Sequence, residues 1–184
     1  MLRLLRRPLT WFLAVALAVA GGVGLAWFQP WKLVTDRAVD ETLAVVPAPA
    51  ASASALPPPA SGATPQPAVV RRGAFISHEH ETSGQARVVR RTDGSQVLEL
   101  VGLDTSNGPD LRVWLSDQPV LPGSRGWHVF DDGEWVELGR LKGNRGDQAY
   151  PIPAGTDLER LAGVTIWCKR FSVSFGAAGL TPAT

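Results

Sequence analysis

The cysteine at position 168 has the most distinctive chemistry in this 184-residue chain, because it is the only thiol in the sequence. It lies in IWCKRFSVSFG (residues 166–176), directly before two basic residues whose charge would lower the pKa of the thiol if they lay close to it. A thiol outside the cytoplasm is exposed to oxidants, so an unpaired Cys168 indicates a reactive group, a cofactor ligand or an intermolecular disulfide. The alternative is a small buried hydrophobe in line with Val164 and Ile166.

Two histidines, His78 and His80, stand two positions apart in SHEHETSG (residues 77–84). On a strand, side chains at this spacing point to the same face, so the two imidazoles could share a metal ion. The sequence indicates no third or fourth ligand, and the spacing is not that of a metalloprotease helix. The interpretation we favour is a polar, solvent-facing strand end.

Several other kinds of chemistry have no motif in this sequence. A c-type haem attachment site needs two cysteines, and there is no G-x-S-x-G, phosphate-binding glycine loop or zinc cluster. We therefore expect no independent catalytic activity. The RGD tripeptide at 145–147 is a weak adhesion signal, and the turn preference of its Gly-Asp pair accounts for it. Residues 71–184 are nearly neutral, with 13 Lys/Arg against 14 Asp/Glu, so nucleic acid is not an expected partner.

The N-terminal residues predict a membrane anchor. A cytoplasmic basic tail (residues 1–8) precedes an uncharged apolar run over residues 9–28, which reaches the roughly 20 residues needed to cross a bilayer as a helix. The arginines before the run place the N-terminus in the cytoplasm and the rest of the chain outside, at the cell membrane. The alternative is a signal peptide cleaved near Ala20, which would release a secreted protein. The apolar run continues beyond Ala20, and this favours an uncleaved signal anchor.

Residues 29–70 are expected to form a juxtamembrane segment followed by a Pro/Ala/Ser-rich linker. The densest stretch is PAPAASASALPPPASGATPQP (residues 47–67). Proline fixes φ and removes hydrogen-bond donors, while Ala and Ser supply too little apolar surface to fold. We expect a semi-rigid spacer that acts as a stalk and lifts the following domain off the membrane.

Residues 71–184 predict an all-β domain. Short β-rich segments alternate with turns rich in Gly, Asn, Asp and Pro, at the spacing of an antiparallel sandwich or barrel of about eight short strands. The segments are GAFIS, ARVVR, QVLEL, LRVWL, WVELG, QAYPI, VTIWC and FSVSFG.

The alternation around Cys168 predicts its local geometry. Val164, Ile166 and Cys168 share one strand face, and Trp167 lies on the other. The apolar positions change parity after Lys169–Arg170, which predicts a bulge or tight turn there.

The motifs of this domain, taken in order, resemble the DM-thirteen electron-transfer domain family over roughly residues 72–180. The resemblance rests on GAF (73–75), HETSG (80–84), NGPDLRVWLS (107–116), LGRLKGNRGDQAYPIP (138–153) and VTIWCKRFSVSFGAAGL (164–180). It implies a component of extracytoplasmic redox systems that works with a redox partner protein, in animals alongside DOMON-type domains thought to bind haem. The characteristic cysteine of the family matches Cys168, which the resemblance assigns as a bare thiol or as a ligand to a prosthetic group such as haem. His78 or His80 would be the opposite axial ligand only if the fold brought it across from Cys168.

Two hypotheses follow. The first is a membrane-anchored extracytoplasmic redox or electron-transfer domain that acts through Cys168. The second is a non-catalytic cell-surface β-sandwich that binds a partner through loops near SNGPD (106–110) and KGNRGDQ (142–148), with Cys168 buried in the core. The position of Cys168 in the fold discriminates between them.

Overall fold

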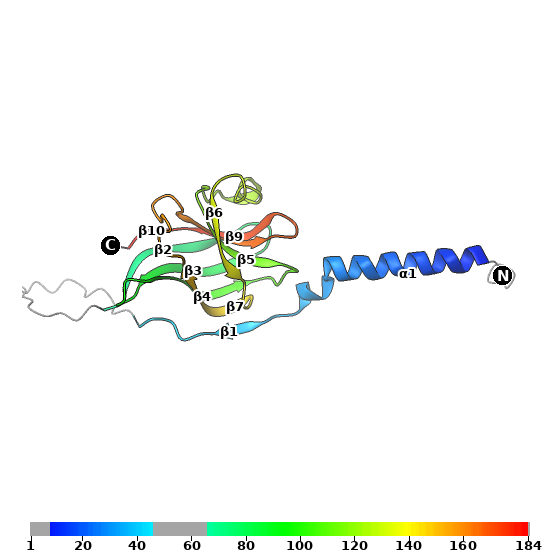
Figure 1. The fold of residues 1–184 in the computed structure, drawn as a ribbon, viewed down its shortest axis with the longest axis horizontal. Coiled ribbons are helices and arrows are strands. Elements are labelled where there is room, and N and C mark those ends of the chain that lie inside the picture. The colour runs from blue at the N-terminus through cyan, green and yellow to red at the C-terminus, as the bar shows by residue number, and fades with distance from the viewer. Residues whose placement is uncertain (1–7, 46–65, 184) are drawn as a thin grey trace, which may run out of the picture.

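The computed structural model describes residues 8–45 and 66–183, so the N-terminal arginines and most of the Pro-rich linker lie outside the described residues. Helix α1 (Pro8–Phe28) projects from a compact β domain and is followed by a short 3₁₀ helix, η1 (Pro30–Val34) (Figure 1). No residue of α1 is buried. By length and composition, residues 8–32 are a candidate membrane span or signal sequence.

All eight segments predicted as strands form strands, and the described part of the chain adds two short ones. The strands are β1 (Ala38–Asp40), β2 (Ala68–Ser77), β3 (Thr82–Arg90), β4 (Gln96–Thr105), β5 (Leu111–Ser116), β6 (Trp135–Arg140), β7 (Arg145–Ile152), β8 (Gly163–Cys168), β9 (Val173–Gly179) and β10 (Thr181–Pro182). A single 3₁₀ turn, η2 (Gly123–Gly126), interrupts the long connection between β5 and β6.

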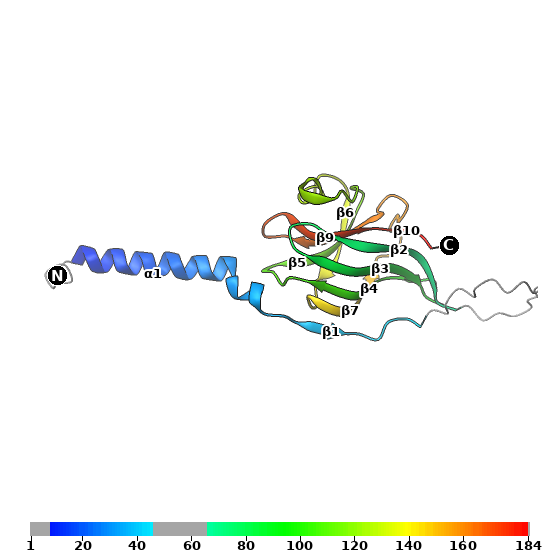
Figure 2. The same cartoon turned by 180° about the vertical axis from the view of Figure 1, so that it is seen from behind.

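The strands form two layers that share β2. Their order is β1-β7-β4-β3-β2-β9-β8-β5-β6, with β10 paired to β2. The first part of β2 pairs with β3, and residues 75–77 of β2 pair with β9, so this long strand passes from one layer into the other (Figure 2). Because β1 and β6 are the end strands of this order, the described sheet is open, and the fold is a sandwich.

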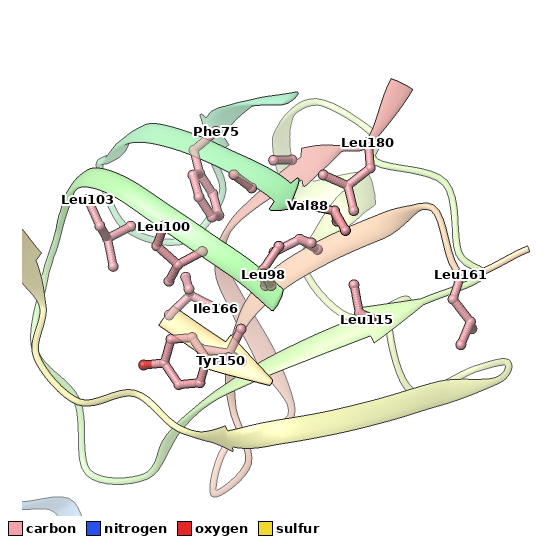
Figure 3. Packing of buried hydrophobic residues seen from close by; sticks show 14 of the residues in the cluster. Phe75, Val88, Leu98, Leu100, Leu103, Leu115, Tyr150, Leu161, Ile166 and Leu180 are labelled. Carbon is pink, nitrogen blue, oxygen red and sulfur yellow. The ribbon is translucent and has the colours of Figure 1, made fainter. Parts of the chain in front are cut away.

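The core lies between the two layers and follows the predicted alternation. Aliphatic side chains from β3, β4, β5 and β8, Ile166 among them, pack there with Phe75 of β2 and Tyr150 of β7 (Figure 3). A second, smaller cluster on the other face of the β5–β9 layer holds Trp114, Phe130, Trp167 and Ala177. Trp135, by contrast, is 39% exposed.

The turn preference of the Gly-Asp pair predicted a turn at the RGD tripeptide, and that prediction is wrong. Arg145, Gly146 and Asp147 begin strand β7 and pair with β1 and β4. The carboxylate of Asp147 accepts a hydrogen bond from the Gly102 amide at 2.7 Å, and Arg145 forms ion pairs. These residues belong to the sheet rather than to a projecting loop.

The segment that follows η1 is part of the β domain. We call residues 35–45 the strap. Within it, β1 pairs in parallel with β7, from Ala38 opposite Arg145 to Asp40 opposite Asp147. The Glu41 carboxylate accepts hydrogen bonds from Lys142 Nζ at 2.7 and 2.8 Å and from the Ala149 amide at 2.9 Å. The strap therefore fixes the end of α1 to one edge of the sheet.

Most of the expected stalk lies outside the described residues, but the residues on either side of it are placed. The strap runs along the sheet away from α1, so that β1 lies between α1 and the chain that leads into the linker (Figure 1). Ala44 before the linker and Pro67 after it line the same surface cavity. The described residues that flank the linker thus lie together at the end of the domain distant from α1.

Candidate functional site around Cys168

Cys168 is the last residue of β8 and is completely buried, with 0% relative exposure. It pairs across the sheet with Leu111 on β5 and Val173 on β9. Its side chain belongs to the main core cluster together with Val164 and Ile166, whereas Trp167 lies in the second cluster, as the alternation predicts. The packing of Cys168 is therefore that of a small core residue.

Backbone groups near Cys168 partly oppose the effect of burial on the pKa of its thiol. Burial raises the pKa of the Cys168 thiol, while the backbone amides of Phe171, Arg170 and Asp110 act in the opposite direction. These three N–H groups come from two loops, one after β8 and one before β5. We call this arrangement the amide cradle. Because burial dominates, the resting thiol is protonated near neutral pH, and the three backbone amides only partly offset the effect of burial on its pKa.

The basic neighbours of Cys168 do not supply that stabilisation. Lys169 Nζ lies 3.4 Å from a carboxylate oxygen of Glu137. The Arg170 guanidinium donates to the backbone carbonyl of Trp27 and lies 5.2 Å from the centre of its ring. Both charged groups contact other partners. The groups that lower the pKa of the thiol are therefore the backbone amides and not these two side chains.

A tight turn over residues 169–172 directly follows Cys168, in the place where the parity change predicts one. The Phe171 amide donates to the Cys168 carbonyl at 3.2 Å, and Ser172 adopts a left-handed conformation with φ of 47°. The end of α1 holds this turn from outside. The rings of Phe28 and Phe171 stack with their centroids 5.7 Å apart, next to the Arg170–Trp27 contact.

A cavity of about 350 Å³ lies where α1 meets the domain. We call it the junction cavity. Its lining includes Phe28, His80, Gly108, Pro109, Phe171 and Phe175. Gly108 and Pro109 directly precede the Asp110 amide of the cradle, and Phe171 carries another of the three amides. The same two loops therefore line the cavity and supply the amides that lower the pKa of Cys168.

His78 is buried, which corrects the prediction of a solvent-facing side chain. Its Nδ1 lies 2.7 Å from the Ser174 hydroxyl and its Nε2 lies 3.0 Å from the Leu121 carbonyl. A carbonyl can only accept, so Nε2 carries the proton and Nδ1 accepts from Ser174. Burial lowers the pKa of His78. Both ring nitrogens are used within the protein, so this imidazole is a structural group.

His80 lies elsewhere, at the junction cavity. Its ring packs on Phe175 with the centroids 3.9 Å apart, and its Nε2 lies 3.1 Å from a carboxylate oxygen of Glu79. The two histidines follow the end of β2 rather than lying on it, which is why they do not share a face. Across the described residues, no group of three or more His, Cys, Asp or Glu side chains is arranged to hold a metal ion.

A haem ligated by Cys168 does not fit these residues. Cys168 has no exposed surface, and it is absent from the linings of four cavities on the described part of the chain. His78 has no free ring nitrogen, and His80 lies in the cavity beyond Phe175. The chemistry that this site supports is that of the thiol itself.

Sequence reasoning identified Cys168 but missed the groups around it. Backbone amides carry no side-chain signal, and the contribution of α1 depends on tertiary packing. The one usable signal was the NGPDL motif, which contains Gly108, Pro109 and Asp110.

Comparison with known proteins adds a family assignment. The family model described as Electron transfer DM13 matches residues 74–180, which is more than half of the chain. No curated protein and no solved structure matches the chain. The matched range contains the loops of the amide cradle and Cys168.

Proposed function

Because the chain belongs to the Electron transfer DM13 family, we propose that it is a membrane-anchored electron-transfer domain, held outside the cytoplasm, whose redox-active group is the Cys168 thiol. The family assignment supports a general redox role. The single observation that carries the choice of Cys168 is its position, because the only thiol of the chain lies within the range that matches the family and directly before a short turn.

The chemistry proposed is a two-electron oxidation of the thiol. A hydroperoxide transfers one oxygen atom to the Cys168 sulfur, and the products are a sulfenic acid and an alcohol or water. A thiol of a partner protein then condenses with the sulfenic acid, which forms a mixed disulfide and releases water. The cradle amides would stabilise the thiolate that attacks and the sulfenate that results.

Access to the buried sulfur requires the turn over residues 169–172 to open. The turn is short, its Phe171 side chain is 40% exposed, and Ser172 holds a left-handed backbone conformation that is unfavourable for a residue with a Cβ. Such segments open locally at a lower free energy than the global unfolding of the domain. We infer that the turn opens while the sheet stays folded.

The membrane anchor is supported by α1, which is long, uncharged and unburied. The arginines that precede it favour a cytoplasmic N-terminus and an external domain. The strap then keeps the domain against the end of the helix, so the site at Cys168 faces the membrane surface.

A second function is favoured by a different observation. Complete burial and a raised pKa are the properties of an inert structural cysteine. In that case the domain is a binding module that presents its loops to a partner, and Cys168 contributes only to packing.

One experiment separates the two functions. The full chain, purified in detergent, is treated with hydrogen peroxide in the presence of dimedone, which traps sulfenic acids. Because the chain has one cysteine, a single adduct of the native protein reports Cys168, and the Cys168→Ala variant is the matched control. An adduct on the folded protein supports the redox proposal. An adduct that forms only after unfolding rejects it and supports the binding module.

A further inference from the structure

We propose that the junction cavity binds the uncharged, flat ring of a lipid-soluble quinone that enters from the membrane. This inference rests on the proposed function in two respects, the membrane anchor and the electron-transfer role. It adds a ligand class and a binding site that are separate from the thiol.

The size and walls of the cavity fit a single ring system. Its volume of about 350 Å³ lies at the small end of the roughly 300–1,000 Å³ typical of ligand sites. Aromatic side chains stand on two sides, with Phe28 stacked on Phe171 and Phe175 packed on His80. Flat ligands gain from stacking on such rings.

Polar groups at the cavity match the carbonyl oxygens of a quinone. Lys32 lies in the lining, and its ammonium donates to the Pro109 carbonyl at 3.4 Å, which uses one of its three N–H groups. His80 Nε2 donates to the Glu79 carboxylate, so its second ring nitrogen, Nδ1, can donate only when the imidazole is protonated. A quinone has two hydrogen-bond acceptors and no donor, so it can take one hydrogen bond from Lys32 and one from the protonated imidazole of His80.

The place of the cavity in the molecule fits delivery from the bilayer. Phe28, the last residue of α1, forms part of its wall, and Pro30 of η1 forms another part. Figure 1 shows α1 leaving the domain at this end. If α1 spans the membrane, the cavity lies at the depth of the lipid headgroups, with Trp27 and Trp31 as interfacial anchors. The ring of a quinone can enter there while its apolar tail stays in the lipid.

Occupation of the cavity should be coupled to the reactivity of Cys168. The turn that follows Cys168 supplies Phe171 to the cavity wall, so a bound ring is lost when the turn opens. A ligand that binds only the closed form reduces opening by a factor of 1 + [L]/Kd. At a concentration ten times Kd, the labelling rate of Cys168 is expected to fall about 11-fold.

The test uses the full chain in detergent micelles and decylubiquinone, whose substituted ring resists direct addition of thiols. Retention of decylubiquinone on gel filtration is measured first, with the Cys168→Ser variant, so that binding is read without any thiol chemistry. Stoichiometric retention is expected. The concentration dependence of maleimide labelling of Cys168 is measured second, and a saturable decrease is expected.

Two variants and a control locate the site. His80→Phe keeps a ring against Phe175 but removes a donor, and Lys32→Met keeps the length of the side chain but removes its charge. Each is expected to weaken retention about 5- to 10-fold, the effect of one hydrogen bond. Trp135→Ala removes an exposed aromatic ring outside the cavity and should leave retention unchanged.

Failure of this inference is distinguishable from failure of the proposed function. The quinone site would be overturned if the protein retained no more decylubiquinone than empty micelles do. It would also be overturned if His80→Phe and Lys32→Met each retained as much decylubiquinone as the unmodified protein. Competition by decanol as strong as by decylubiquinone would replace it with a groove for an acyl chain. None of these results changes dimedone trapping, which contains no quinone and tests Cys168 alone.

Discussion

Truncation of Phe28 to alanine should expose Cys168 without changing any residue of the β domain. Phe28 belongs to α1, yet its ring stacks on Phe171 in the turn that follows Cys168. If the turn opens locally, this stack is one of the contacts that opening must break. Phe28→Ala therefore lowers the free energy of opening and raises the labelling rate of the thiol.

The size of the effect follows from the geometry of the stack. Ring centroids 5.7 Å apart at an interplanar angle of 20° belong to the class of aromatic pairs worth about 0.5–1.5 kcal/mol beyond their buried area. When opening and closing are fast, the labelling rate is the opening constant multiplied by the rate of the free thiol. Since 1.4 kcal/mol corresponds to tenfold, the rate should rise about 2- to 12-fold.

The assay is pseudo-first-order maleimide labelling of the full chain in detergent, followed by intact mass. Trp135→Ala is the matched control, because it removes a ring stacked on Trp114 with centroids 4.0 Å apart, away from the turn. That variant should lose global stability but label at the wild-type rate. The reasoning is refuted if Phe28→Ala labels like the wild type, or if Trp135→Ala labels faster in proportion to its lost stability.

Three further predictions concern the rest of the fold. Because the pKa of His78 is lowered by folding, the unfolded chain binds more protons than the folded chain below about pH 6.5. The stabilisation from the neutral imidazole should be complete above that pH and fall below it by up to about 1.4 kcal/mol per pH unit, until the folded pKa is reached. Urea titrations at pH 7.5 and 5.5 measure this slope, and His78→Gln should flatten it. Glu41→Gln should lower the free energy that holds the strap on the sheet by about 1 kcal/mol, a value discounted for the partial exposure of the carboxylate. Hydrogen exchange at the Ala149 amide should then be about fivefold faster. An unchanged exchange rate would show that the Glu41 carboxylate does not hold the strap. Gly146→Ala places a Cβ against the Val39 carbonyl at a φ of 94°, so it should detach β1 and expose the strap to trypsin at Arg37; continued resistance there would contradict the assigned pairing.

The strands could be predicted because their alternation and turn residues are local signals. The face of Cys168 was predicted for the same reason, since Val164 and Ile166 fix the parity of β8. The position of His78 could not be, because the chain leaves the strand at Ser77 and the alternation no longer applies. Its burial depends on Ser174 and Leu121, which are distant in sequence.

The strap and the amide cradle lay outside the reach of sequence patterns for physical reasons. β1 is only three residues long, too short for an alternation to appear, and its pairing depends on β7 more than 100 residues later. The cradle is made of backbone N–H groups, which every non-proline residue carries. That three of them lower the pKa of one thiol depends on the tertiary fold alone.

The docked strap also bears on the junction cavity. Release of the strap would free the β domain from the end of α1. The junction cavity would be lost at the same time, because Phe28 and Pro30 belong to its wall.

The most direct test of the central claim is the denaturant dependence of Cys168 oxidation in the full chain. Sulfenic acid formation by hydrogen peroxide, trapped with dimedone, is measured from zero urea to just below the unfolding transition. The account predicts a measurable rate that hardly changes with urea, because opening of a four-residue turn exposes little surface. A rate that rises with the slope of global unfolding would contradict it and leave Cys168 as a packing residue.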